Sequence, residues 1–261
     1  MPVSEPEAPE LLVRTAEDGT ATITISNPAR RNAMSVAMWE SLPHMLAALA
    51  ADPEVRVLVL TGAGDTFCAG ADINDLAAPD GARAAQRAAV AAEEAVAAFP
   101  KPTLAAVRGF CVGGGCQLAV ACDLRFAAQG ARFGVTPARL GIVYPASSTR
   151  RLAELTSPST AKHLLFSAEL IDHERALRTG LVDEVLPPDA LDKRVREFTD
   201  VLKSRSQLTQ AAAKEFAGAA PDPARTAHWQ RQARLSGDTD EGTAAFLAGR
   251  EPRFTWSPPA D

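Results

Sequence analysis

Along the first half of the chain, segments in which hydrophobic residues have the spacing of a strand alternate with segments in which they have the spacing of a helix. Two β-branched runs, 11–15 and 20–26, flank Asp18-Gly19, a pair typical of a hairpin turn. Apolar residues at helical spacing then predict a helix over 35–49, in which Pro43 is expected to cause a kink or an interruption. The apolar run 55–61 is typical of a buried strand and ends in a glycine-containing turn.

The same alternation continues downstream. A loop is expected over 65–80, followed by a helix over 83–99, a strand over 103–107, a glycine cluster with a helix to about 121, and a strand over 124–127. Strands that alternate with helices predict a largely parallel sheet with crossover helices, and hence an α/β fold. Beyond about residue 161 the pattern becomes helical, with segments at 159–167, 172–179, 189–203, 206–218, 222–235 and 239–248 and a short apolar piece at 181–186.

These patterns divide the chain into three parts. An acidic, proline-containing segment over 1–10 is expected to be disordered, an α/β core is expected over 11–195, and a helical region over 196–261. The first residues lack the basic start and apolar stretch of a signal peptide, and no apolar run reaches the length of a transmembrane helix. The chain is therefore expected to be cytoplasmic, with no membrane partner.

Composition narrows the possible functions. The 261 residues are 46% hydrophobic and 23% charged, which is ordinary for a globular protein. The net charge of −5 argues against a nucleic-acid partner, because binding to phosphate backbones requires a basic surface. Four cysteines without paired C-x-x-C spacing indicate free thiols and no zinc site.

Two glycine-bearing loops carry the candidate chemistry. The first, Phe67-Cys-Ala-Gly-Ala-Asp-Ile73, follows a buried strand, and the second, Gly113-Gly-Gly115, opens a helix. The second is neither G-x-G-x-x-G nor a phosphate-binding P-loop, so no nucleotide cofactor is expected. Two backbone N–H groups that converge on one oxygen form an oxyanion hole, which stabilises an enolate or a tetrahedral oxyanion. Taken singly, a loop of this kind is more often a tight turn that lets a helix pack closely on a strand.

The order and spacing of short motifs strengthen the catalytic interpretation. From Leu12 to Trp256 the chain resembles the enoyl-CoA hydratase/isomerase family, the crotonase superfamily. The matching blocks include Asn27-Pro-x-x-Arg31-Asn-Ala-Met34, the two glycine loops, Phe99-Pro-Lys-Pro102, Cys122-Asp-Leu-Arg125, Ala176-Leu-x-x-Gly-Leu-Val-Asp183 and Glu241-Gly-Thr-Ala-Ala-Phe246.

The resemblance implies a crotonase-like β-β-α spiral core with a helical C-terminal trimerisation region. It implies an enzyme that binds an acyl-CoA thioester, stabilises its enolate, and forms a homotrimer or a dimer of trimers. Coenzyme A then enters as part of the substrate, and neither a metal nor a separate cofactor is expected. Carried over position by position, the oxyanion N–H groups fall on Ala71 and Gly114, and the substrate-binding residues are Arg31, Ala33, Ala69, Asp72, Ile73 and Gln117.

The chain departs from the family pattern at the acid–base positions. Typical hydratases have glutamates where this chain has Gln117 and Pro137, and the positions used by some isomerases hold Val143, Tyr144, Pro145 and Ala146. Glutamine does not exchange protons and proline has no polar group, so the two-glutamate route of hydration is not supported by these residues.

Tyr144 suggests a second route. The stretch Thr136-Pro through Leu140-Gly141 to Tyr144 resembles the methylmalonyl-CoA decarboxylase branch, in which departing CO₂ leaves an enolate and a weak acid reprotonates carbon. That branch often has histidine at the position of Ala71 and glutamate at the position of Gln117. The alternatives are therefore a decarboxylase and a non-catalytic CoA-binding homologue, while the RNA-binding role of some relatives is disfavoured by the net charge of −5.

Overall fold

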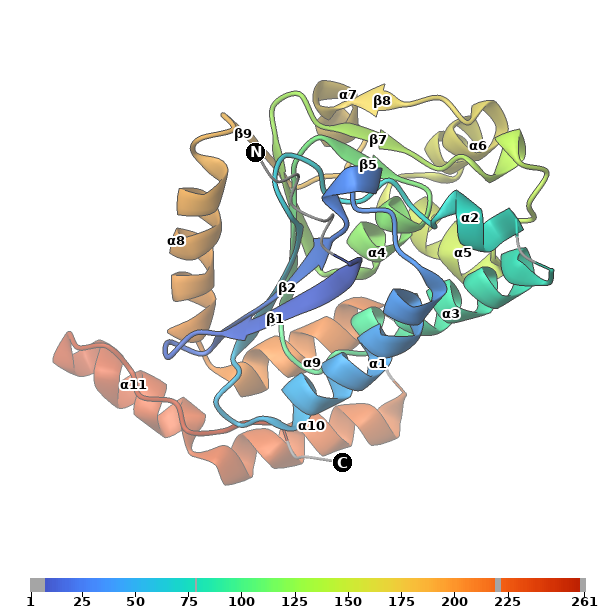
Figure 1. Ribbon diagram of the computed structural model, residues 1–261. Helices are drawn as coiled ribbons and strands as arrows, with labels where there is room; N and C mark the ends of the chain where they lie inside the picture. Colours follow the sequence, from blue (N-terminus) through green and yellow to red (C-terminus); the bar gives the residue numbers. More distant parts are fainter. Residues whose placement is uncertain (1–7, 78, 219–221, 259–261) are drawn as a thin grey trace.

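A six-stranded sheet forms the centre of the computed structural model, which describes residues 8–258 except 78 and 219–221 (Figure 1). Its strand order is β1-β2-β3-β4-β6-β9. The β1–β2 hairpin is antiparallel and the remaining pairs are parallel, which confirms the expected α/β class. The strands are β1 (Glu10–Thr15), β2 (Thr20–Ser26), β3 (Val57–Gly62), β4 (Thr103–Val107), β6 (Leu124–Ala128) and β9 (Glu184–Leu186).

The start of the chain was expected to be disordered over residues 1–10. Residues 1–7 lie outside the described part, and Glu10 already pairs with Ser26 as the first residue of β1.

A second, three-stranded sheet lies beside the site and was not predicted from the sequence. It consists of β5 (Phe110–Val112), β7 (Arg132–Gly134) and β8 (Ile171–Asp172), with β7 in the middle. Strands of two or three residues are too short to show an alternating pattern. The sheet matters because β5 leads directly into the glycine loop at 113–115.

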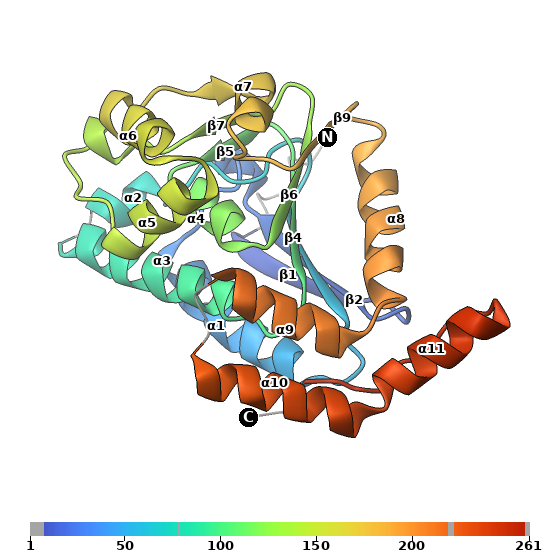
Figure 2. The same ribbon diagram turned by 180° about the vertical axis from the view of Figure 1, so that it is seen from behind.

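Helices cover both faces of the large sheet. Helix α8 (Leu191–Lys203) lies alone on one face, where Leu191 and Val195 pack against Leu104 and Phe126 (Figure 2). Helices α1 (Val36–Ala51), α3 (Gly81–Ala97) and α4 (Gly114–Ala121) contribute to the larger core on the other face. The expected boundary between residues 195 and 196 therefore falls inside a helix that belongs to the core, and the separate C-terminal helices begin after Lys203.

Helix α1 is continuous, so the interruption expected at Pro43 is wrong. A proline inside a helix costs about 3 kcal/mol, because it removes one hydrogen bond and crowds the preceding turn. The same helix buries Met38, Trp39, Leu42 and two further leucines. Each such side chain contributes about 1.5–3 kcal/mol on burial, so the packing of this face outweighs the cost of Pro43.

The remaining helices surround the site or extend the C-terminus. The short ones are α2 (Ile73–Ala77), α5 (Ala146–Leu155), α6 (Pro158–Ser167) and α7 (His173–Arg178), and two 3₁₀ turns cover Pro28–Arg30 and Pro137–Arg139. The C-terminal helices are α9 (Gln207–Gly218), α10 (Pro223–Ser236) and α11 (Asp238–Ala248). Helix α11 projects from the rest of the chain in both views, and its Phe246 is 84% exposed (Figures 1 and 2). Within the described residues, no helix is both long and apolar enough to cross a bilayer.

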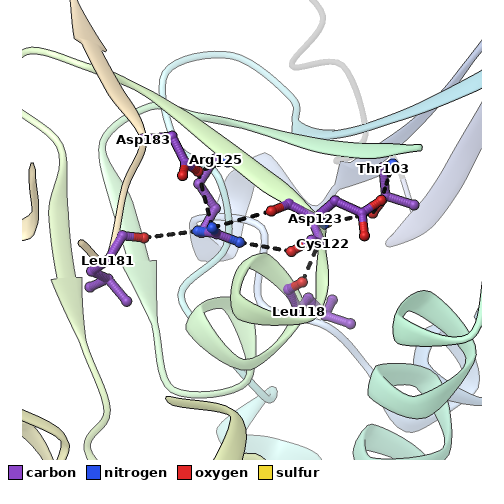
Figure 3. Close-up of polar contacts among 7 residues, drawn as sticks. All are labelled: Thr103, Leu118, Cys122, Asp123, Arg125, Leu181 and Asp183. Atoms are coloured by element: carbon purple, nitrogen blue, oxygen red, sulfur yellow. Dashed lines mark hydrogen bonds and ion pairs between the residues drawn. The ribbon is translucent and has the colours of Figure 1, made fainter. Parts of the chain in front are cut away.

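A buried arginine forms hydrogen bonds at the C-terminal end of α4, the helix whose N-terminal end lies at the candidate site. Arg125 donates from Nη1 to the carbonyl of Cys122 (2.7 Å), from Nε to the carbonyl of Leu181 (2.9 Å) and from Nη2 to Asp183 Oδ2 (3.0 Å) (Figure 3). Asp123 accepts a bond from the Thr103 amide at 2.7 Å. These bonds hold α4 against β4 and β6, which fixes the direction in which its N-terminus points.

Candidate active site

A cavity of about 560 Å³ opens between the two glycine loops, α3 and the segment before α5. Its lining is mostly apolar, and its charged side chains are Arg31 and Arg139. The residues of the predicted site that line it are Arg31, Ala69, Ala71, Ile73, Gly114, Gln117 and Tyr144. No cluster of three or more metal-ligating side chains occurs in the described part of the chain.

The first loop is fixed by backbone bonds on both sides of Ala71. Met34 donates to the carbonyl of Gly70 at 2.8 Å, and Asp72 donates to the carbonyl of Met34 at 2.9 Å. The Ala69 amide also donates, to the backbone carbonyl of Arg31. Ala71 differs, because its own N–H donates to no described residue. The loop thus leaves one backbone donor unpaired at the wall of the cavity.

The second loop leaves a matching donor at the start of α4. Gly113 precedes the helix with φ of +56°, a conformation that favours glycine, and its amide donates to the carbonyl of Gly134 at 2.8 Å. Gly114 is the first helical residue, so its N–H has no partner within the helix. Among the described residues it has no other acceptor either. The helix dipole adds partial positive charge at this amide.

The two loops approach each other closely. A Cβ built on Gly70 would lie 3.4 Å from the Gly114 nitrogen, and one built on Gly114 would lie 3.8 Å from the Ala71 nitrogen. Trp39 also leaves no space for a side chain at Gly114, because the same Cβ would lie 2.8 Å from the Trp39 ring. Glycine is required here for space, and the packing of Trp39 holds the second loop against the first.

Gln117 lies one turn into α4 and is held by an acid from another helix. Its Nε2 donates to Glu93 Oε2 on α3 at 2.6 Å. Glu93 is completely buried and also accepts from Ser148 Oγ and Arg151 on α5. The sequence interpretation did not single out Glu93. Its signal was an acidic residue four positions after Ala89, on the apolar face of an alanine-rich helix.

Tyr144 lines the cavity, and its hydroxyl makes no hydrogen bond within the described part of the chain. A core tyrosine normally bonds its hydroxyl, so this arrangement differs from a purely structural one. Burial raises the pKa of Tyr144 well above its ordinary value, with smaller contributions from Cys116 and Glu93, and the phenol therefore stays protonated near neutral pH. The tyrosine loop is tied to α3, because Gln86 Nε2 donates to the carbonyl of Val143 at 2.7 Å.

The structure does not bring every residue of the predicted binding set into the cavity. Arg31 stacks over the ring of Phe110, 4.9 Å from its centroid, and Ile73 is exposed at the rim. Ala33 and Asp72 are not part of the lining. Asp72 instead accepts from Arg30 Nη1 at 2.7 Å, and Ala33 accepts at its carbonyl from a buried asparagine. Asp72 thus links the first loop to the segment 27–33, and the Ala33 contact lies within that segment.

Comparison with known proteins places this chain in one family. The profile of the enoyl-CoA hydratase/isomerase family matches residues 15–256. A protein of Syntrophomonas wolfei named crotonyl-CoA hydratase is 34% identical over 256 residues, with 94% of this chain and 98% of that protein covered. The 2,3-dehydroadipyl-CoA hydratase of Escherichia coli is 33% identical over 249 residues, with 93% and 98% covered.

Solved structures agree with the sequence matches. An enoyl-CoA hydratase/isomerase family protein from Hyphomonas neptunium superposes with a TM-score of 0.88 at 34% identity, over 95% of this chain and 98% of that one. The chain belongs to the enoyl-CoA hydratase/isomerase family and has the crotonase fold, as the sequence resemblance implied. It is thus an acyl-CoA enzyme of that family. The decarboxylase and non-catalytic alternatives gain no support from the names of these relatives.

Proposed function

We propose that the cavity binds an acyl-CoA thioester and stabilises its enolate between the N–H groups of Ala71 and Gly114. The observation that carries the proposal is the pairing of two unused backbone donors at one wall of the cavity, while the flanking amides of Ala69, Asp72 and Gly113 are all engaged. Donors fixed in this way need no reorganisation when negative charge develops on the thioester oxygen.

The rest of the cavity suits the two ends of such a substrate. Arg31 and Arg139 supply positive charge where the phosphates of coenzyme A require it, and Arg31 is held in place over Phe110. The acyl end faces Ala85, Ala89 and Ile142, so apolar side chains surround much of the acyl chain.

Tyr144 is the proton donor in this proposal. Addition to the β-carbon of an enoyl thioester, or loss of a group from the α-carbon, moves an electron pair toward the thioester oxygen. The enolate returns the pair to the α-carbon when that carbon takes a proton. A protonated phenol beside the acyl group, such as Tyr144, can supply that proton and recover one from water afterwards.

The relatives named above are hydratases, and hydration of an enoyl thioester is therefore the first reaction to test. Gln117 and Pro137 stand where the two-glutamate route requires carboxylates, so we propose that this route is not used. The purified protein should be incubated with enoyl-, malonyl- and methylmalonyl-CoA esters, and the products identified by mass spectrometry. Conversion of at least one ester supports enolate chemistry. Binding without conversion of any ester would leave a CoA-binding homologue, and loss of CO₂ from a malonyl ester would establish decarboxylation.

The proposed enzyme is a cytoplasmic homotrimer or a dimer of trimers. Apolar side chains exposed on the C-terminal helices, such as Phe216 and Phe246, support an assembly in which these helices pack against other copies.

A further inference from the structure

The carboxylate of Glu93 is surrounded by hydrogen-bond donors. Oε2 accepts from Gln117 Nε2 at 2.6 Å and from the hydroxyl of Ser148, and Oε1 accepts from the guanidinium of Arg151. The side chain is completely buried, and Arg151 compensates its charge. None of these contacts is needed for the oxyanion hole, so Glu93 requires its own explanation.

The contact with Glu93 fixes which end of the Gln117 amide faces the cavity. An ionised carboxylate only accepts hydrogen bonds, so the NH₂ group of Gln117 must point toward Glu93. The amide oxygen is then the group left for the cavity. Gln117 lines the cavity and retains 5% exposure, and its oxygen accepts no bond from a described residue.

We infer that Glu93 is a positioning residue that makes Gln117 a hydrogen-bond acceptor for the acyl group. Gln117 follows Gly114 by three residues on α4, a rise of about 4.5 Å, so it lies beside the first acyl carbons when the thioester oxygen is at Gly114. The cavity therefore favours acyl groups with a hydrogen-bond donor near the β-carbon over groups with an acceptor there. This inference rests on the proposed function, because it takes the cavity to bind acyl-CoA.

Replacement of Glu93 by glutamine is expected to reverse this polarity. Arg151 continues to attract the amide oxygen of the new glutamine at position 93. The NH₂ group of that glutamine therefore takes the place of Oε2 beside Gln117. Two NH₂ groups repel, and Gln117 must turn its oxygen toward residue 93 and its NH₂ group toward the cavity.

The test compares two ligands that differ only at the β-carbon. The probes are 3-aminobutyryl-CoA, whose ammonium group only donates, and 3-oxobutyryl-CoA, whose ketone only accepts. Their affinities are measured by calorimetry with the intact protein, and butyryl-CoA serves as the reference. The wild type is expected to prefer the amine, and Glu93→Gln is expected to shift the ratio of the two dissociation constants toward the ketone by about tenfold or more. The affinity for butyryl-CoA should stay unchanged.

Three variants separate this role from others. Ser148→Ala keeps the bond between Glu93 and Gln117 and should keep the wild-type preference. Gln117→Met should abolish the preference, whereas a direct effect of the Glu93 charge on the ammonium group would persist in it. If Glu93→Gln does not fold, Glu93→Gln/Arg151→Lys replaces it, because a lysine keeps a cationic donor for the amide oxygen of residue 93 and for Glu94.

The outcomes are distinct. An unchanged ratio in Glu93→Gln, or an equal loss of affinity for all three esters, would overturn the positioning role while leaving the proposed function intact. Failure of the wild type to bind even butyryl-CoA would overturn the proposed function itself. A ratio that shifts in Glu93→Gln and is abolished in Gln117→Met supports the inference.

Discussion

Ala71 and Gly114 come together from two loops more than forty residues apart, and a Cβ on Gly114 would lie 3.8 Å from the Ala71 nitrogen. Neither amide donates to another described residue, and both residues line the cavity. Each loop is held by bonds of its neighbours, Met34 to Gly70 on one side and Gly113 to Gly134 on the other. The donors are therefore rigid before a substrate arrives, which is the condition for stabilising a transition state.

Hydration of crotonyl-CoA should be slow. Each acid–base group typically contributes about 10²–10⁴-fold, and the two carboxylates of the usual route are replaced by Gln117 and Pro137. The measurement is the loss of enoyl absorbance, with a hydratase that carries both glutamates assayed alongside. A comparable rate in the two enzymes would show that other residues activate water.

Gln117→Glu alone is not expected to restore hydration, because it places a second carboxylate against Glu93. Gln117→Glu/Glu93→Gln keeps a single carboxylate in the pair.

Replacement of Tyr144 by phenylalanine should lower kcat by about 10²-fold or more, with little change in affinity for a non-reactive CoA ester. The ring still packs, and only the hydroxyl is lost. Because that hydroxyl has no partner in the described structure, the melting temperature should stay close to that of the wild type. A core hydroxyl with a bonded partner would instead contribute about 0.5–1.5 kcal/mol to stability. A normal kcat in this variant would remove Tyr144 from the catalytic residues.

Light scattering should give three or six times the mass of the 27.5 kDa chain. Helix α11 exposes Phe246 and Leu247 by 84% and 80%, a large apolar surface for a free monomer. Phe246→Glu should weaken the assembly, and Glu251→Gln, a change at an exposed residue that follows α11, serves as a surface control. A stable wild-type monomer at micromolar concentration would contradict the assembly.

Alkaline pH should destabilise the fold through its buried thiols. Burial raises the pKa of Cys68 and of Cys122 to about 12. An unfolded thiol ionises near pH 8.5, so the stabilisation is complete below that pH and is lost progressively as the pH rises toward 12. Each thiol contributes up to about 1.4 kcal/mol per pH unit to this slope.

The check is denaturant unfolding between pH 8 and 10.5 under reducing conditions. Cys122→Ala should show a shallower fall in the free energy of unfolding than the wild type. Parallel slopes in the two proteins would mean that the Cys122 thiol is accessible in the folded state.

The sequence predicted those parts of the fold whose signal is local. The hairpin at Asp18-Gly19 and the strand 103–107 are found as expected, because turn chemistry and a short apolar run are both signals carried by a few neighbouring residues. Helix α5 was missed, since Ser147, Ser148 and Thr149 give its first turns no apolar period. The small sheet was missed because its strands are two or three residues long.

The candidate site also contains features that the sequence could predict and features that it could not. The two glycine loops could be found because backbone donors require glycine at fixed places in the sequence. The contact between Glu93 and Gln117 could not, because 24 residues separate them and only the packing of α3 on α4 brings them together. The role of Trp39 in closing the space beside Gly114 likewise depends on tertiary packing.

The paired donors at Ala71 and Gly114 are tested most directly by the carbonyl stretching frequency of a bound thioester. Butyryl-CoA labelled with ¹³C at the thioester carbon allows this band to be read by infrared difference spectroscopy without turnover. Gly114→Pro removes one donor, and Gly114→Ala is the matched control, because both variants crowd Trp39 but only the alanine keeps its N–H. In the wild type the band should move to lower frequency on binding. Gly114→Ala should keep more of this shift than Gly114→Pro, and kcat/KM should be about 10²–10³-fold lower in the proline variant than in the alanine variant. A band in the bound wild type at the frequency found in water, or an equal shift in the alanine and proline variants, would contradict the oxyanion hole.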